Sequence, residues 1–273
     1  MFSQKSKAWL MIILTGWCCA YFAQATTKVQ LPKWQHVSLE GAPSLRGSAI
    51  LGNSLWVSGS NNSVFVSQDG GATWQNKSVN SSIKTDFRDI ELFDAQTAIV
   101  MGVGSGEQSQ LFKTTDGGSN WQLLYQNKDK AGFFDSIAFW DRSTGLLLGD
   151  PVDGYYVVKK TKDGGKTWRR ITKAKLPAIL EKEAAFAASG NTLIVGDNGN
   201  AWITTGGFSA SVYESNDYGE TWTPQAVPLY QETQTAGGYG LALNAANQVF
   251  VLGGDYQQRP ASYSNMASKV NGQ

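Results

Sequence analysis

The stretch Ser67-Gln68-Asp69-Gly70-Gly71-Ala72-Thr73-Trp74 decides the fold, because the same pattern returns three more times along the chain. All four copies share the form S/T-x-D-x-G-x-x-W, and their aspartates are 47, 47 and 54 residues apart. A period of this length is typical of a protein built from repeated four-stranded blades. The later copies are Thr114-Thr115-Asp116-Gly117-Gly118-Ser119-Asn120-Trp121, Thr161-Lys162-Asp163-Gly164-Gly165-Lys166-Thr167-Trp168 and Ser215-Asn216-Asp217-Tyr218-Gly219-Glu220-Thr221-Trp222.

The residue types in this box predict a structural role. Asp-Gly-Gly suits a tight hairpin turn, since glycine accepts a positive φ and aspartate can bond the backbone N–H groups of its own turn. The tryptophan that follows is large enough to fill the gap between neighbouring blades. We therefore expect no catalytic residue among the box positions, which are Asp69, Gly71, Trp74, Asp116, Gly118, Trp121, Asp163, Gly165, Trp168, Asp217, Gly219 and Trp222.

The segments between the boxes predict an all-β propeller of four-stranded antiparallel blades. The first blade spans residues 47–79. In the second, strands are expected at residues 87–92, 97–102, 110–113 and 121–124, and in the third at residues 134–139, 145–148, 155–159 and 168–171. The fourth blade is expected to begin with residues 184–187 and 192–195, followed by a longer segment at residues 202–211.

The two ends of the chain predict how a fifth blade is made. Residues 239–243, 248–252 and 261–270 supply three strands. Trp34-Gln35-His36-Val37-Ser38 resembles the strand after a box, so it could be the fourth strand and close the ring without an exposed edge. Counted in this way the chain makes about five blades.

The first 25 residues read as a secretory signal peptide. Lys5 and Lys7 precede an apolar stretch, and Ala23-Gln24-Ala25 gives a small-x-small cleavage pattern. A membrane anchor is disfavoured because the stretch is short and interrupted by Thr15 and Gly16. A lipoprotein is also disfavoured, since Trp17 precedes Cys18 where a small residue is needed. We expect an exported protein, periplasmic or secreted, whose mature chain (residues 26–273) has no stable membrane anchor.

Composition narrows the range of functions. Both cysteines, Cys18 and Cys19, lie in the expected signal peptide, so stability in an oxidising compartment must come from packing rather than disulfides. Removing Lys5 and Lys7 changes the formal charge from +1 to −1, and without a basic field nucleic-acid binding is not expected. His36 is the one histidine, which argues against a histidine metal site or a histidine-based triad.

Several of these segments resemble the photosystem II stability and assembly factor group and its bacterial relatives outside photosynthesis. The Asp boxes are shared with sialidases and other exported propellers. The resemblance covers the chain from about Trp34 onward. It implies a ring of six or seven blades, with C-terminal sequence missing here, and a non-enzymatic assembly role in the photosynthetic members. The segments that carry it are residues 46–47, 87–90, 149–154, 184–190 and 253–256.

Polar residues gather at the blade ends opposite the box turns, where the innermost strands begin and the second strands end. They predict a mixed-charge pocket at the channel mouth that could hold a peptide segment, a small polar or glycan ligand, or a cation. The alternative is structural, because Gly-Asp makes turns and Arg–Asp pairs can join blades. The candidates are Arg46, Arg88, Asp135, Asp150, Asp153, Glu183, Asp197, Tyr239, Asp255 and Tyr256.

Three function classes remain to compare. A non-catalytic binding or assembly scaffold for an envelope protein fits the repeat, the signal peptide and the family resemblance. A sialidase-like glycoside hydrolase using the channel-mouth Arg, Asp and Tyr residues is the alternative, although such chemistry needs an arginine cluster that six mature-chain arginines supply poorly. A redox enzyme finds no support in any cofactor or haem motif. The sequence therefore predicts no cofactor, no metal and no assigned catalytic residue.

Overall fold

The computed structural model describes residues 34–188, 190–258 and 264–269. Two compact units are present, Met1–Val37 and Ser38–Gln273. The described residues of the first unit, 34–37, have no regular secondary structure. The expected signal peptide at residues 1–25 lies outside the described residues. Within the described ranges, no helix has the length and apolar character needed to cross a membrane.

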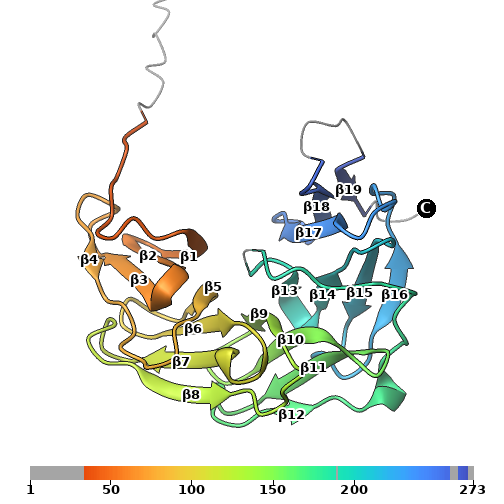
Figure 1. The fold of residues 1–273 in the computed structure, drawn as a ribbon, viewed down its shortest axis with the longest axis horizontal. Helices are drawn as coiled ribbons and strands as arrows, with labels where there is room; N and C mark the ends of the chain where they lie inside the picture. Colours follow the sequence, from red (N-terminus) through yellow and green to blue (C-terminus); the bar gives the residue numbers. More distant parts are fainter. Residues whose placement is uncertain (1–33, 189, 259–263, 270–273) are drawn as a thin grey trace, which may run out of the picture. The chain divides into compact units, whose positions relative to one another are not determined.

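The unit Ser38–Gln273 consists of five antiparallel sheets that follow one another along the chain (Figure 1). In each sheet the strands pair in sequence order. The first sheet is β1 (Leu45–Leu51), β2 (Ser54–Gly59), β3 (Ser63–Ser67) and β4 (Gln75–Asn76), and the second is β5 (Asp86–Leu92), β6 (Ala98–Val103), β7 (Gln110–Thr114) and β8 (Gln122–Gln126). The third is β9 (Phe134–Phe139), β10 (Gly145–Val152), β11 (Tyr155–Thr161) and β12 (Arg169–Arg170).

The last two sheets complete the propeller unit. The fourth is β13 (Leu193–Val195), β14 (Ala201–Thr204), β15 (Ser211–Ser215) and β16 (Thr223–Ala226). The fifth is β17 (Ala236–Leu243), β18 (Val249–Asp255) and β19 (Met266–Ser268). Short 3-10 turns η1 (Ser60–Asn62), η2 (Gly106–Gln108), η3 (Lys173–Lys175) and η4 (Asp197–Gly199) join some of these strands. The predicted all-β, five-bladed propeller is confirmed.

The fourth blade differs from the prediction. Its innermost strand is β13, whereas residues 184–187, expected to be that strand, make only a single bridge from Ala184 to Gly206. The segment predicted as one long element, residues 202–211, is divided between β14, a loop and the start of β15. The extra residues of this repeat therefore lie mainly between the third box of the chain and β13, where the backbone forms no strand of the fourth sheet.

The described part of the fifth blade contains three strands, with β19 at its outer side. Residues 34–39, which include the segment expected to supply the fourth strand, are assigned to no strand. Because residues 34–37 belong to the other unit, their pairing with the fifth blade stays a prediction.

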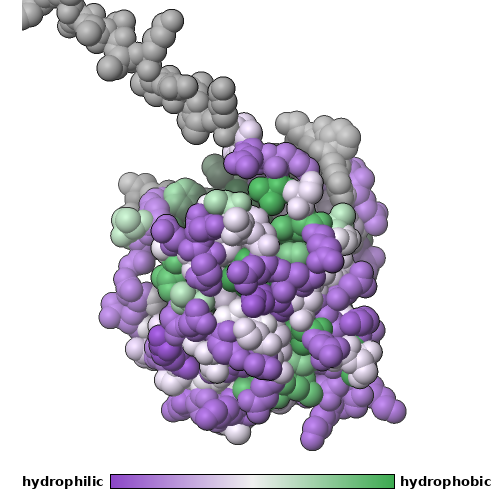
Figure 2. Space-filling model, turned by 90° about the vertical axis from the view of Figure 1, so that its left-hand side faces the viewer, coloured by the Kyte–Doolittle hydropathy of each residue, from purple (hydrophilic) through white to green (hydrophobic). Residues whose placement is uncertain are grey.

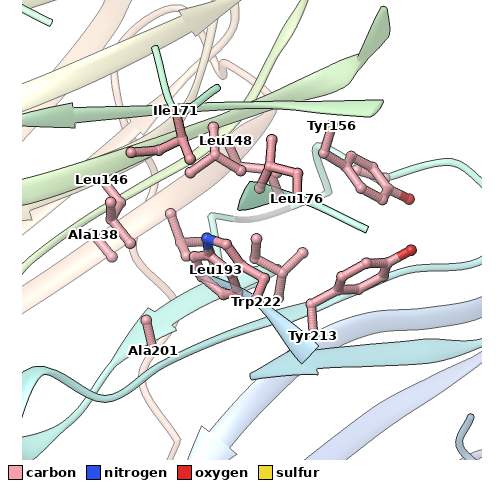
Figure 3. Packing of buried hydrophobic residues seen from close by; sticks show 13 residues of the cluster. Ala138, Leu146, Leu148, Tyr156, Ile171, Leu176, Leu193, Ala201, Tyr213 and Trp222 are labelled. Carbon is pink, nitrogen blue, oxygen red and sulfur yellow. The ribbon is translucent and has the colours of Figure 1, made fainter. Parts of the chain in front are cut away.

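The box tryptophans of the second, third and fourth blades pack between consecutive blades. The ring of Trp121 meets Trp56 of the first blade edge-on at 6.2 Å, and its Nε1 donates to the carbonyl of Lys77 at 2.8 Å. Trp222 lies in the cluster that joins the third and fourth blades, which also contains Leu146 and Leu193 (Figure 3). Burial of these large rings stabilises the junctions that they fill.

Each box turn is closed by the same set of hydrogen bonds. In the first copy, Oδ1 of Asp69 accepts from the N–H of Thr73 at 2.9 Å and from Oγ of Ser67 at 2.8 Å. Oγ of Ser67 in turn accepts from the N–H of Gly71 at 2.8 Å. These bonds lower the pKa of Asp69 to about 2, and the same holds for Asp116 and Asp163. The carboxylates are thus committed to their own turns.

Candidate functional site

Four innermost strands carry a β-bulge near the end where the chain enters the blade. Pairing with the second strand is interrupted around Arg46 on β1, Arg88 on β5, Asp135 on β9 and Tyr239 on β17. A bulge adds one residue to a strand and changes the direction of its side chain. The repeated architecture therefore brings four different side chains to equivalent places around the propeller axis.

These four residues line one cavity of about 510 Å³. Asp150 on β10 and Tyr256, just after β18, also line it, as do residues of the segment before β13. Six of the ten sequence-predicted site residues are thus brought together. The complete lining is Arg46, Arg88, Phe133, Asp135, Asp150, Ala185, Phe186, Ala187, Ala188, Tyr239 and Tyr256.

Arg88 connects the second blade to the segment before β13. Its Nη1 donates to the carbonyl of Ala187 at 2.8 Å, and its Nη2 lies 3.5 Å from a carboxylate oxygen of Asp86. Nε of Arg88 is buried and has no hydrogen-bond partner among the described residues. Arg46, by contrast, is exposed at the cavity mouth. The cavity therefore offers one anchored and one exposed guanidinium group.

Two carboxyl groups face these arginines. Asp135 is 1% exposed, and its Oδ2 has no hydrogen-bond partner among the described residues. Burial, together with the nearby charge of Asp150, raises the pKa of Asp135 well above its usual range, although Arg88 opposes the shift. Burial also raises the pKa of Asp150 to about 6. Both carboxyl groups therefore bind a proton more readily than they would in water.

An aromatic group forms the opposite wall. The ring of Phe186 meets those of Tyr239 and Tyr256 edge-on, at 5.2 and 6.1 Å between centroids. The hydroxyl of Tyr239 lies 2.7 Å from the carbonyl of Gly254 and accepts from the N–H of Tyr256 at 2.9 Å. Burial raises the pKa of Tyr239 to about 12, so this phenol stays neutral and the wall is rigid and largely apolar.

Two predicted site residues have structural roles instead. Glu183 is 3% exposed and accepts hydrogen bonds from Oη of Tyr213 at 2.7 Å and the N–H of Leu180 at 2.8 Å. Asp255 ends β18, where each of its carboxylate oxygens accepts from a threonine hydroxyl at 2.7 Å. Burial opposes the effect of these bonds, but the pKa of Asp255 is lowered overall. Neither residue lines the cavity.

The other two lie at the surface away from the cavity. Asp153 is in the turn between β10 and β11 and forms an ion pair with Lys173 at 2.9 Å. Asp197 was expected at the end of a second strand, but it lies in η4, between the first and second strands of its blade. That turn is next to the fourth box, since the carbonyl of Gly199 accepts from the N–H of Tyr218. Asp197 is therefore on the box face. The prediction for Asp197 was wrong because the strand before it, β13, is the innermost strand of the blade and not the second.

Sequence reasoning missed the cavity residues that come from irregular segments. Phe133 precedes β9, and Phe186 lies in the segment that was expected to be a strand. The signal available was the run Ala184-Ala185-Phe186-Ala187-Ala188, whose small residues allow close approach of the backbone to Arg88. In the described ranges, no group of three or more His, Cys, Asp or Glu residues is placed to hold a metal ion.

The family model that matches the sequence is described as photosynthesis system II assembly factor YCF48, and it covers residues 22–106. No curated protein sequence matches the chain. The chain is thus an Asp-box propeller that resembles this assembly factor over its N-terminal part. The matching family is described as an assembly factor, and enzymes occur among the structural matches below.

Solved structures with the same fold include both binding proteins and enzymes. A structure described as YCF48 bound to D1 peptide has a TM-score of 0.55 and 16% identity, over 87% of this chain and 71% of that one. The GH74 xyloglucanase of Xanthomonas campestris has a TM-score of 0.54 and 15% identity, over 79% and 36%. Regucalcin of Agrobacterium tumefaciens, described as a calcium-binding protein, has a TM-score of 0.51 and 14% identity, over 85% and 77%. At these identities the likeness concerns the fold alone.

Proposed function

We propose that the protein is an exported, non-catalytic scaffold that binds an extended segment of another polypeptide in the cavity of Arg46, Arg88 and Asp150. The observation that most directly supports this proposal is that four bulged residues from different blades face one cavity with aromatic and charged walls. A cavity with a few convergent polar groups and an apolar wall is the usual form of a recognition site.

The chemistry of the walls supports a peptide ligand. Exposed Arg46 can reach a backbone carbonyl or an acidic side chain, and ionised Asp150 can accept from a backbone N–H or a basic side chain. The rings of Phe186, Tyr239 and Tyr256 can pack against apolar side chains. The peptide-bound YCF48 structure supports the same class of ligand.

The face of the molecule drawn in Figure 2 does not favour a flat interface. Figure 2 shows a largely hydrophilic surface on the left-hand side of Figure 1, with small, scattered apolar areas. Stable flat interfaces usually have a continuous apolar centre. The expected signal peptide supports export, so the envelope is the compartment in which we place the partner.

Binding is tested with the whole exported protein as bait in an envelope fraction, followed by measurement of affinity for each recovered partner. The variant Arg46→Ala/Arg88→Ala/Asp150→Ala should bind the partner with an affinity at least tenfold lower. The control Arg142→Ala/Arg169→Ala/Asp153→Ala makes the same change in charge at residues outside the cavity and should bind normally. Retention of the partner by the cavity variant would refute the site.

Glycoside hydrolysis is the second candidate, and the paired carboxyl groups favour it. Asp135 and Asp150 both line the cavity, and burial raises the pKa of each, which is the kind of shift that a general acid requires. Among the described residues, however, the cavity holds only two arginines. Turnover of a panel of fluorogenic glycosides, lost in Asp150→Asn, would support hydrolysis. Absence of turnover across the panel would eliminate it.

A further inference from the structure

One segment of the third blade differs in charge from the rest of the chain. Residues 157–175 contain eight Lys or Arg residues and a single acid, Asp163, which belongs to the third box. The remaining residues have 15 Lys or Arg against 21 Asp or Glu, so the segment has a net charge of +7 and the rest of the chain −6. A local excess of this size indicates a surface for an anionic partner, although the whole chain is nearly neutral.

The fold places these charges at the outer edge of the third blade. Their residues lie on β11, in the third box turn, on β12 and in η3, and β12 is the outermost strand of its sheet (Figure 1). None of them lines the cavity that contains Arg88 and Asp135. Six of the eight are exposed, and we call these six the basic band: Lys162, Lys166, Arg169, Arg170, Lys173 and Lys175.

The acid of the neighbouring blade offsets only part of this charge. Glu220, in the fourth box, lies 2.5 Å from Arg169 and 3.4 Å from Lys175. The same carboxylate also lies 3.1 Å from Nζ of Lys160, a lysine on β11 that is almost fully buried. One negative charge thus faces three positive ones, and an excess of two remains at this place.

Other cations of the band have no opposite charge at all. Among the described residues, Lys162, Lys166 and Arg170 form no ion pair, and all three are exposed. Burial, together with the nearby charges of Lys166 and Arg142, lowers the pKa of Lys113 on the second blade. Like charges therefore crowd at this edge, which destabilises a folded chain unless a counter-charge is bound.

The surroundings of the band favour a partner that is recognised by charge alone. No large hydrophobic residue of segment 157–175 is exposed, whereas a stable protein interface usually has an apolar centre. Nucleic-acid bases stack on free aromatic faces. Here three tyrosine rings are each covered by a lysine ammonium at 5.1 to 5.6 Å, in the pairs Lys159–Tyr125, Lys160–Tyr218 and Lys173–Tyr155.

We propose that the basic band docks the protein on the anionic headgroups of a lipid bilayer. A bilayer presents many phosphate groups in one plane and requires no pocket, so it matches separate exposed cations at an outer edge. The band shares no residue with the cavity of Arg46, Arg88 and Asp150. The inference therefore does not depend on the function proposed for that cavity.

Vesicle sedimentation tests this docking. The whole protein is mixed with vesicles of phosphatidylcholine alone or of an equal mixture of phosphatidylcholine and phosphatidylglycerol. Wild type should bind the mixed vesicles more tightly, and raising NaCl from about 0.05 M to about 0.5 M should release it, because salt screens exposed charges. Equal binding to the two kinds of vesicle would overturn the proposal.

The variant Lys162→Gln/Lys166→Gln/Arg170→Gln removes the three cations that form no ion pair. It should bind the mixed vesicles about a hundredfold more weakly, since each cation near an anionic bilayer strengthens binding about fivefold. The variant Lys162→Arg/Lys166→Arg/Arg170→Lys keeps the charge and should bind as the wild type does. Residues 1–33 are present in every protein compared, so their contribution cancels. Wild-type binding by the glutamine variant would overturn the proposal, and so would a loss in the charge-retaining variant.

A matched control removes the same charge outside the band. Lys84, Lys182 and Lys269 are exposed on other parts of the described chain. The variant Lys84→Gln/Lys182→Gln/Lys269→Gln should weaken binding to the mixed vesicles by less than about threefold, because distant charges are screened. An equal loss in the control and in the band variant would overturn the proposal. Tighter binding of the wild type to a DNA duplex than to the mixed vesicles would also overturn it, by showing that the band takes a nucleic acid instead.

Discussion

Asp89, the residue after Arg88 on β5, is expected to make the folding stability depend on pH. Its carboxylate is 7% exposed and accepts hydrogen bonds from the N–H groups of Ile137 at 2.7 Å and Ile90 at 2.8 Å. Oγ of Ser136 also lies 3.0 Å from Oδ2. Burial outweighs these bonds and raises the pKa of Asp89 from 3.8 to about 7. The carboxyl thus joins the second and third blades in a buried place that favours its neutral form.

The sign of the effect follows from the direction of this shift. Between pH 4 and 7, approximately, the folded protein retains a proton on Asp89 that the unfolded chain has lost, so the free energy of unfolding falls as the pH rises. Below about pH 4, Asp89 is protonated in both the folded and the unfolded state, so its titration takes nothing from the free energy of unfolding. The rise in the pKa of Asp89 from 3.8 to about 7 corresponds to about 4 kcal/mol of unfolding free energy, and this amount is fully lost above about pH 8.

Urea unfolding of the wild type and Asp89→Asn at pH 4.5 and 8.5 measures this quantity. Asparagine cannot titrate, so the difference in unfolding free energy, wild type minus variant, should fall by about 4 kcal/mol between the two pH values. A constant cost from altered hydrogen bonds cancels in this comparison, as do the contributions of Asp135 and Asp150. The control is Asp94→Asn, because the pKa of Asp94 is lowered and it does not titrate in this window.

A difference for Asp89→Asn that stays constant from pH 4.5 to 8.5 would refute the reasoning. It would mean that the three hydrogen bonds compensate fully for burial and keep Asp89 ionised in the folded state. A difference that rises with pH would contradict the sign itself.

Two further predictions concern the boxes. Trp121→Ala should lower the unfolding free energy by about 3 kcal/mol in urea, because the ring contact across the blades and the bond to Lys77 are lost; a loss below about 1 kcal/mol would contradict the interblade role. Gly219→Ala should lower the melting temperature more than Gly154→Ala. Both glycines have positive φ, but a methyl group at Gly219 would meet Leu146 at 2.6 Å, whereas Gly154 faces open space. Equal melting temperatures would contradict this difference.

The strands next to the boxes could be predicted from sequence because local chemistry specifies them. In every copy the Asp and the Ser or Thr bond groups within the same turn, as Asp116 and Thr114 do. The turn therefore forms in the same way whatever its neighbours, and it positions the third and fourth strands. The innermost strand of the fourth blade was misplaced because no such local signal precedes it, and residues 184–187 are apolar enough to imitate a strand.

The candidate site could be predicted in part, for a related reason. Arg46 and Arg88 were recognised from their equivalent positions in two repeats, and the structure shows that a bulge at each position directs both to one cavity. Phe186 could not be found in this way, since it comes from a segment that leaves the repeat and is held by the bond from Arg88 to Ala187. Repeat symmetry thus predicts where polar side chains converge.

One side of the cavity is formed by a segment that departs from the repeat symmetry. In the fourth blade the segment before β13 brings small residues and one aromatic ring to the cavity, where the other four blades each place a bulged residue, and Phe186 contacts Tyr239 and Tyr256 of the next blade. The extra length of the fourth repeat, which lies before β13, therefore supplies an aromatic residue of the cavity wall.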